Sequence, residues 1–329
     1  MEYIDFDGEQ NSLIATIEKP IIDADECLIK VAASGINRAD LLQRAGKYPA
    51  PAGESPILGL EVAGVIEQVG KSVSDWQLGQ RVCALVPGGG YAEYTKVKAS
   101  HLIPLPDDFS FEQGAATAEV FLTAYQSLFT IAALKPGDSV LIHAGASGVG
   151  SAAIQLAKAV GAAVVTTVSN QLKVQACEKF GADHVINYRE LDFVEWTKTH
   201  YATGFDVVLD VVGGDYLTRN INVSALDGRI VMLAMLSGRY SDKVDIAKLL
   251  LKRVNIHAST LRNRSDDYKT DLVQDFCRDF YPMLVNKQIT PIIDSCYSWQ
   301  QVELAHQRMA SNQNIGKLIL SSPRFNGAQ

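Results

Sequence analysis

The spacing of apolar residues changes near residue 120 of this chain. Before it, apolar and polar positions alternate in short runs separated by glycine and proline, and the runs cover residues 26–33, 61–69, 80–86 and 91–97. Alternation of this kind is typical of half-buried strands. With one helical piece at residues 37–45, the pattern predicts a compact, partly open β-barrel.

After residue 120, apolar runs alternate with helical patterns. A helix is expected over residues 112–130, and strands are expected at residues 139–144, 163–168, 183–187, 206–211, 228–234 and 254–259. Helices between most of these strands imply right-handed crossovers on both faces of one sheet. We therefore predict a doubly wound, six-stranded parallel sheet of the Rossmann type.

The last part of the chain carries a different pattern. Helices are expected at residues 268–286 and 299–311, and a final strand at residues 314–320. We predict an α/β protein of two domains. The first is formed by residues 1–119, with residues 262–329 returning to it, and the second by residues 120–261.

A glycine-rich turn joins the first strand of the predicted parallel sheet to a small-residue helix. It reads HAGASGVG over residues 143–150, with Ser147 where the G-x-G-x-x-G pattern has its middle glycine. Small residues let the backbone approach a pyrophosphate, and the helix N-terminus presents N–H groups to it. We expect Gly145, Ser147, Gly148 and Val149 to bind a dinucleotide. The alternative is a tight strand-to-helix turn without a ligand.

The segment after the second strand bears on which dinucleotide is bound. An NAD site places a carboxylate about 20 residues past the turn, whereas residues 169–173 read SNQLK. A 2′-phosphate requires donors and positive charge, so Ser169, Asn170 and Lys173 favour NADPH. The alternative reading makes Lys173 a solvated residue in the first turn of a helix.

Composition excludes several classes of protein. The net charge is −7 with 30 scattered Lys and Arg, which argues against a nucleic-acid surface. Neither a signal peptide nor a membrane span is expected, and the cytoplasm is the default location. The five cysteines and six histidines show no ligand spacing, so no metal site is expected.

Five separated motifs resemble one family. They read AASGINRADLLQR (residues 32–44), LGLEVAG (58–64), PGGGYAEY (87–94), HAGASGVG (143–150) and NIGK (314–317). The chain resembles the zinc-free NADPH:quinone oxidoreductases of the medium-chain dehydrogenase/reductase superfamily, and most closely their p53-inducible quinone oxidoreductase branch. The resemblance implies a GroES-like barrel as the catalytic domain, a Rossmann domain for NADPH, and reduction of quinones by hydride transfer.

The resemblance also bears on zinc. Zinc-dependent relatives have cysteine where this chain has Asn37, histidine where it has Leu60, and another cysteine near Glu119. A catalytic zinc site requires three protein ligands and an open position. One carboxylate would not hold the metal, so the resemblance implies a zinc-independent enzyme that reduces electron-poor acceptors rather than oxidising alcohols.

Further site residues rest on the resemblance or on topology. Asn37 and Tyr48 are the catalytic candidates. The alternative for Asn37 is that it caps the N-terminus of the following helix, and the alternative for Tyr48 is that it is a plain loop tyrosine. The resemblance implies cofactor contacts from Thr123, Gln126, Tyr188 and Lys317. The alternative for Thr123 and Gln126 is that they are buried polar residues of a helix. The alternative for Tyr188 is that a tyrosine stands at the strand end by chance, and for Lys317 that it is a surface lysine. By topology, the segments containing Met235, Leu236 and Leu261 should wall the nicotinamide.

Two other functions stay open at this point. The same scaffold and cofactor serve reduction of the carbon–carbon double bond of an enone or enoyl thioester. A non-catalytic NADPH-binding protein belongs to a different class. The expected partner is a small quinone or conjugated carbonyl, and a homodimer is expected through the apolar sheet edge at residues 254–259.

Overall fold

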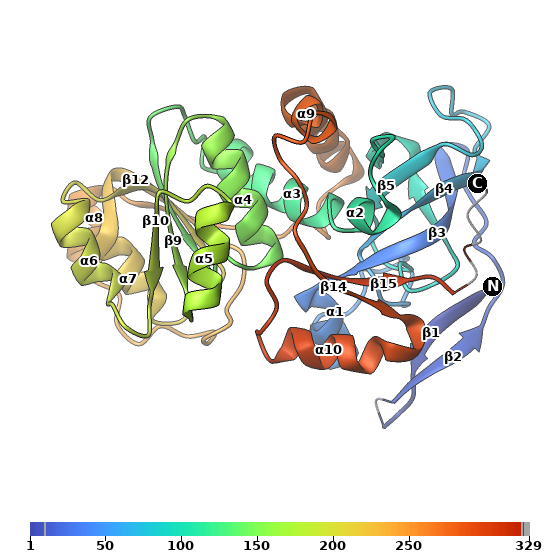
Figure 1. Ribbon diagram of the computed structural model, residues 1–329, viewed down its shortest axis with the longest axis horizontal. Coiled ribbons are helices and arrows are strands. Elements are labelled where there is room, and N and C mark those ends of the chain that lie inside the picture. The colour runs from blue at the N-terminus through green and yellow to red at the C-terminus, as the bar shows by residue number, and fades with distance from the viewer. Residues whose placement is uncertain (10, 324, 326–329) are drawn as a thin grey trace. The chain divides into compact units, whose positions relative to one another are not determined.

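The computed structural model describes residues 1–9, 11–323 and 325 (Figure 1). By its internal contacts the chain forms two compact units, which we call unit 1 (residues 1–122 and 261–329) and unit 2 (residues 123–260). The N-terminal segment of unit 1 therefore ends at residue 122, three residues later than expected. Its C-terminal segment begins at residue 261, one residue earlier than expected.

Unit 1 is built on a branched sheet of seven strands. The path runs β14–β15–β3–β4–β5–β7, and β6 pairs with β3 as a side branch. The strands are β3 (Glu26–Ile36), β4 (Glu61–Val69), β5 (Arg81–Leu85), β6 (Tyr94–Lys98), β7 (Leu102–Pro104), β14 (Ile293–Ser298) and β15 (Lys317–Ser321). The five expected strands are confirmed as β3, β4, β5, β6 and β15, although β6 and β15 each begin three residues later than expected, and β7 and β14 were not expected.

A two-stranded hairpin at the N-terminus was not expected from the pattern. It joins β1 (Glu2–Phe6) to β2 (Ser12–Thr16) in antiparallel register. Of the two strands, only Ile4 contributes a side chain that is almost completely buried. Strands with so little burial carry a weak alternation, which explains why the pattern missed them.

Short helices connect and cover the strands of unit 1. They are α1 (Arg38–Arg44), η1 (Ala99–His101), α2 (Phe111–Ala115), α9 (Asp266–Val285), η3 (Trp299–Gln301) and α10 (Val302–Ala310). The long helix expected over residues 112–130 is wrong. The chain forms α2, then α3 (Ala118–Tyr125), then the π-helix η2 (Gln126–Ile131). The break follows α2, where the Thr117 hydroxyl donates to the carbonyl oxygen of Gln113.

Unit 2 is a parallel sheet in the order β10–β9–β8–β11–β12–β13, the arrangement of a doubly wound dinucleotide-binding fold. Its strands are β8 (Ser139–His143), β9 (Ala163–Val168), β10 (His184–Asn187), β11 (Phe205–Asp210), β12 (Ser224–Met232) and β13 (Asn255–Ala258). All six predicted strands are confirmed. β12 begins at Ser224, four residues before the expected start. Asp227 lies within this strand with a left-handed backbone (φ 61°), a conformation that is more usual in turns than in strands.

Helices cover both faces of this sheet (Figure 1). They are α4 (Gly148–Ala159), α5 (Gln171–Lys179), α6 (Phe193–His200), α7 (Tyr216–Val223) and α8 (Ile246–Lys252). Leu141, Val165, Val208 and Ile230, from four adjacent strands, are at most 1% exposed. Burial on both faces explains the continuous apolar runs in the sequence. In the described part of the chain, no helix is long and apolar enough to cross a bilayer.

Candidate functional site

The glycine-rich turn of unit 2 is shaped to receive a pyrophosphate. Helix α4 begins at Gly148, directly after β8, and Ser147 is its N-cap with extended backbone. The Ser147 hydroxyl accepts a hydrogen bond from the Gly150 N–H at 3.0 Å. The other N–H groups of the first turn have no intrahelical acceptors, and they share the positive end of the helix dipole. An anion at this position would be stabilised by both.

Close packing explains the glycines of this turn. A Cβ on Gly145 would lie 1.9 Å from the Thr166 hydroxyl oxygen, and one on Gly150 would lie 2.4 Å from the Ala144 carbonyl oxygen. Neither distance is possible, so both positions require glycine for the turn to close. The predicted set Gly145, Ser147, Gly148 and Val149 is thereby gathered in one turn, and it fits a dinucleotide.

The residues expected at the adenosine end follow the neighbouring strands β9 and β10. Asn170 caps α5, since its side-chain oxygen accepts from the Lys173 N–H at 3.0 Å. Lys173 therefore lies in the first helical turn, with a partly exposed side chain. Tyr188, just past β10, is 44% exposed. Because parallel strands end at the same sheet edge, Ser169, Asn170 and Tyr188 lie on the edge that carries Ser147.

The other expected cofactor residues are spread over both units. Thr123 and Gln126 lie where α3 passes into the π-helix, a distortion that is frequent at functional sites. Gln126 is fully buried, whereas Met235 and Leu236, which follow β12, are 61% and 52% exposed. Leu261 is buried in unit 1.

A buried polar network surrounds Asn37 in unit 1. The Lys317 ammonium donates to the Asn37 side-chain oxygen at 2.7 Å and to the Ile36 carbonyl oxygen at 2.8 Å, and it forms an ion pair with Glu61. The Asn37 amide nitrogen donates to Glu61 Oε1 at 3.0 Å. The Glu119 N–H donates to Glu61 Oε2, also at 3.0 Å.

This network changes the expectation for Lys317. The side chain is 3% exposed, so the alternative of a surface lysine is wrong. An ammonium has three donors, and three acceptors within unit 1 already engage them. Its direct contact with the cofactor stays a prediction, whereas its contact with Asn37 is part of the structure.

A second buried chain of polar groups leads away from Asn37. Asn37 occupies the N-cap position of α1, as its alternative reading expected, and the Asp40 carboxylate accepts its N–H at 2.7 Å. The Tyr91 hydroxyl lies 3.4 Å from Asp40 and 3.1 Å from the His306 ring. Burial raises the pKa of Asp40 to about 6, although N–H donors oppose this. Burial lowers the pKa of His306 to about 4.

Tyr48 lies beside an arginine that the sequence reading did not single out. The Arg262 guanidinium carbon is 5.4 Å from the centre of the Tyr48 ring. Burial raises the pKa of Tyr48, Arg262 opposes that shift, and Glu119 adds to it. Tyr48 is therefore a half-buried phenol that lies in a loop next to a cation, and its catalytic role stays a prediction.

The fold and these groups define a class of protein. One unit is a doubly wound sheet with a pyrophosphate-binding turn, and the other carries a buried polar cluster and an aromatic–cation pair. Together they are the parts of a dinucleotide-dependent oxidoreductase.

Comparison with known proteins gives the family. Residues 23–107 match the family model described as the alcohol dehydrogenase GroES-like domain, and residues 148–276 match the one described as zinc-binding dehydrogenase. The chain is 33% identical over 317 residues to the synaptic vesicle membrane protein VAT-1 homolog of Danio rerio, covering 92% of this chain and 66% of that protein. The Homo sapiens counterpart is 31% identical, with 89% and 78% covered. The chain belongs to the medium-chain dehydrogenase/reductase superfamily.

Solved structures give the same fold with two kinds of activity in their descriptions. A quinone oxidoreductase of Pseudomonas syringae pv. Tomato DC3000 is 30% identical, with a TM-score of 0.85 and 97% and 99% of the two chains covered. The CurK enoyl reductase is 26% identical, with a TM-score of 0.85 and 98% and 99% covered. The GroES-like domain and the Rossmann domain are thus confirmed, and the p53-inducible branch stays a prediction.

The zinc in the name of the matching family model does not fit the residues of this chain. Leu60 is buried and has no ligating atom. The Asn37 oxygen already accepts from the Lys317 ammonium, a fixed positive charge that would repel a metal ion. Within the described residues, no three His, Cys, Asp or Glu side chains are grouped to hold a metal.

Three residues of the candidate site were not found from the sequence as site residues. Glu61 had a usable signal, because it is the one carboxylate of the otherwise apolar run over residues 61–66, and a carboxylate buried there requires a partner. Asp40 and Arg262 carried no comparable signal, since both lie in segments of mixed polarity. Only folding shows which of these charges are buried.

Proposed function

We propose that this protein reduces quinones with NADPH by hydride transfer and without zinc. The observation that carries the proposal is the Lys317 ammonium bound to Asn37, at the position where the resemblance places a zinc ligand. Without a Lewis acid, an enzyme cannot readily stabilise the alkoxide that alcohol oxidation requires. An acceptor that is already electron-poor has no such requirement, and a quinone is one.

In the proposed mechanism, the bound dinucleotide supplies a hydride. The turn at the start of α4 holds the pyrophosphate, and the residues after β9 receive the adenosine ribose with its 2′-phosphate. In unit 1, Tyr48 stacks on a flat acceptor or donates a hydrogen bond to its oxygen. The ion pair of Lys317 with Glu61 holds the Asn37 amide in one orientation.

The test is an NADPH-oxidation screen with purified protein. The acceptors are 1,4-benzoquinone, 9,10-phenanthrenequinone and a series of 2-alkenals, with alcohols and oxidised cofactor as the reverse reaction. We expect turnover with quinones and none with alcohols. Turnover of alkenals with none of quinones would replace the proposal by its second candidate.

That second candidate is reduction of a conjugated carbon–carbon double bond. A specific observation favours it, namely the similarity to the CurK enoyl reductase over 98% of this chain. Both reactions use the same cofactor and an electron-poor acceptor, so enoyl thioesters belong in the same screen. Absence of turnover with every acceptor, together with NADPH binding, would support the non-catalytic alternative.

Zinc independence has a separate measurement. Metal analysis of the purified protein should find no stoichiometric zinc, and a chelator should leave quinone reduction unchanged. Stoichiometric zinc, with activity lost to the chelator, would overturn this part of the proposal.

The role of Tyr48 is tested by truncation. Tyr48→Phe retains the ring and removes the hydroxyl, whereas Tyr48→Ala removes both. We expect lower turnover of quinones with unchanged NADPH affinity, and a larger loss for the alanine variant if stacking dominates. Unchanged turnover in both variants would return Tyr48 to the status of a loop residue.

A further inference from the structure

Arg262 is a buried cation with unused hydrogen-bonding capacity. The residue is 7% exposed, and its Nε donates to the Pro87 carbonyl oxygen at 2.8 Å. Both terminal nitrogens are buried, and neither has a hydrogen-bond partner among the described residues. Four N–H donors are therefore unsatisfied. Leaving charged donors unpaired in a protein interior is costly, so a ligand with acceptor oxygens is expected there.

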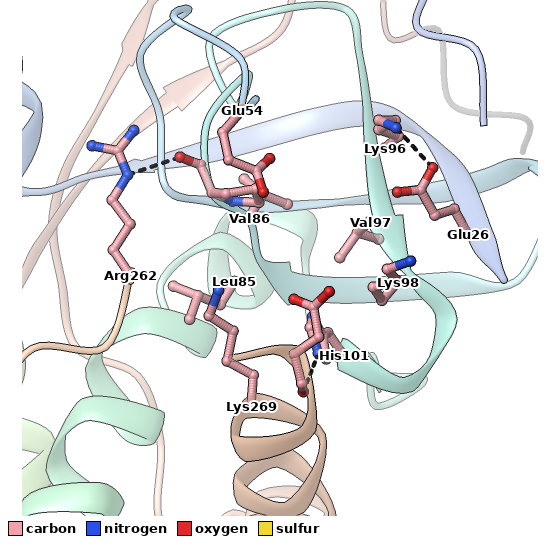
Figure 2. Close-up of a pocket in the computed structure, with 12 residues that line it drawn as sticks. Glu26, Glu54, Leu85, Val86, Lys96, Val97, Lys98, His101, Arg262 and Lys269 are labelled. Carbon is pink, nitrogen blue, oxygen red and sulfur yellow. Dashed lines mark hydrogen bonds and ion pairs between the residues drawn. The ribbon is translucent and has the colours of Figure 1, made fainter. Parts of the chain in front are cut away.

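Acidic side chains near Arg262 do not satisfy it. Arg262 borders a small polar cavity with about 60 Å³ of space for water, which Glu54 and Asp266 also line. No ion pair joins Arg262 to a carboxylate in the described part of the chain. Figure 2 shows the guanidinium directed away from the labelled residues Glu26, Lys96 and His101 across the cavity.

This cavity is too small for an aromatic acceptor, since ligand pockets usually have several hundred Å³. The flat group next to the guanidinium is instead the Tyr48 ring, 5.4 Å from its central carbon. One aromatic face and two unpaired NH₂ groups thus lie together in unit 1. That pairing matches a ligand with a ring and an oxygen on its edge.

We propose that Arg262 binds the acceptor's carbonyl oxygen and stabilises the negative charge that develops on it. This inference rests on the proposed function. Bound NADPH would supply the hydride: the C–H bond of its reduced nicotinamide would break, and the electron pair would move with the hydrogen to the acceptor, which would leave the cofactor oxidised. The acceptor is reduced by two electrons, and its oxygen becomes an anion until water supplies a proton. Two parallel N–H donors from a guanidinium suit such an oxyanion.

The binding test uses p-nitrophenol, whose phenolate imitates the anionic product and absorbs visible light only when ionised. It is titrated with pH in the presence of the protein, with and without oxidised NADP. Because Arg262 pairs with the anion, we expect the phenolate to bind at least about tenfold more tightly than the phenol. Arg262→Met should abolish that preference, and Arg262→Lys should retain part of it.

Arg264→Met is the matched control. Arg264 lies two positions away, and its guanidinium also stacks on a tyrosine, Tyr268, at 4.6 Å. The control should bind phenolate as the wild type does. Thermal unfolding of each variant separates misfolding from loss of binding, and Arg262→Lys retains a cation if Arg262→Met fails to fold.

The kinetic test uses the quinones that the wild type turns over. Arg262→Met should lower kcat by about 100-fold, with a smaller change in KM, since the oxyanion forms only in the reaction. A folded Arg262→Met that keeps both the phenolate preference and kcat would overturn the inference and leave quinone reduction standing. Phenolate preference in a wild type that reduces no acceptor would support the site and reject the proposed function.

Discussion

Replacing Lys317 by methionine tests the buried network around Asn37. Methionine has nearly the same length but no charge and no donor. The change leaves the Glu61 carboxylate, which is 0% exposed, without its cation, and it removes the donor to the Asn37 and Ile36 oxygens. We expect a large loss of stability in unit 1, because an uncompensated charge remains in the interior.

The magnitude follows from the geometry. Removing one partner of a buried ion pair costs about 3–5 kcal/mol. Lys19→Met provides the comparison, since Lys19 lies 3.9 Å from Glu67 with both side chains at least 40% exposed. An exposed pair contributes about 0–1 kcal/mol. In the double variant Glu61→Gln with Lys317→Met neither charge of this pair remains, so its loss should be smaller than the sum of the single losses by about 1–3 kcal/mol.

The assay is urea unfolding followed by tryptophan fluorescence in a Trp196→Phe background. Trp196 lies in unit 2, whereas Trp76 and Trp299 lie in unit 1, so the remaining signal reports on the unit that contains the network. A loss for Lys317→Met no larger than that for Lys19→Met would refute the reasoning. Strict additivity in the double variant would refute the coupling of Lys317 to Glu61.

Three further predictions concern pH, cofactor and assembly. The folded protein holds His306 neutral, with a pKa of about 4 instead of 6.5. At pH values between these two, the unfolded chain therefore binds a proton on His306 that the folded protein does not. The difference in unfolding free energy between the wild type and His306→Gln, measured by urea unfolding, should therefore fall by about 3 kcal/mol from pH 7 to pH 4. A difference that stays constant with pH would contradict this prediction. The Michaelis constant for NADPH should be at least about tenfold below that for NADH, and Lys173→Ala should reduce the difference between the two constants. Equal constants in the wild type would contradict the inference that Lys173 binds the 2′-phosphate. Gel filtration should give a dimer that Ile256→Asp, on the edge strand β13, converts to monomer, and a wild-type monomer would reject pairing through this edge.

The parallel sheet of unit 2 was predictable because its signal is local. Each of the six strands is a short apolar run bounded by turn residues, and burial on both faces leaves few polar interruptions. The break in the expected helix at residues 112–130 was not predictable in this way. Gly114 and Thr117 are weak helix formers beside the break, but no local signal marks the later change to the hydrogen-bond pattern of a π-helix.

The glycine-rich turn also carried its own evidence. A small residue is required wherever backbone or a neighbouring side chain comes too close for a Cβ, and that requirement appears directly in the sequence at Gly145 and Gly150. Lys317 and Arg262 behaved differently. Lys317 was singled out only through the resemblance of its NIGK motif, Arg262 was not singled out at all, and the local pattern distinguishes neither from a surface cation, whereas the fold buries both.

By itself the sequence determined the order of the elements, the class of fold and the dinucleotide-binding turn, because these depend on neighbouring residues and on periodicity. The tertiary structure decided that Lys317 meets Asn37 across 280 positions, and that Arg262 lies against Tyr48 with its terminal nitrogens unpaired. The physical reason is that the cost of burying a charge depends on which distant groups the fold brings within hydrogen-bonding distance.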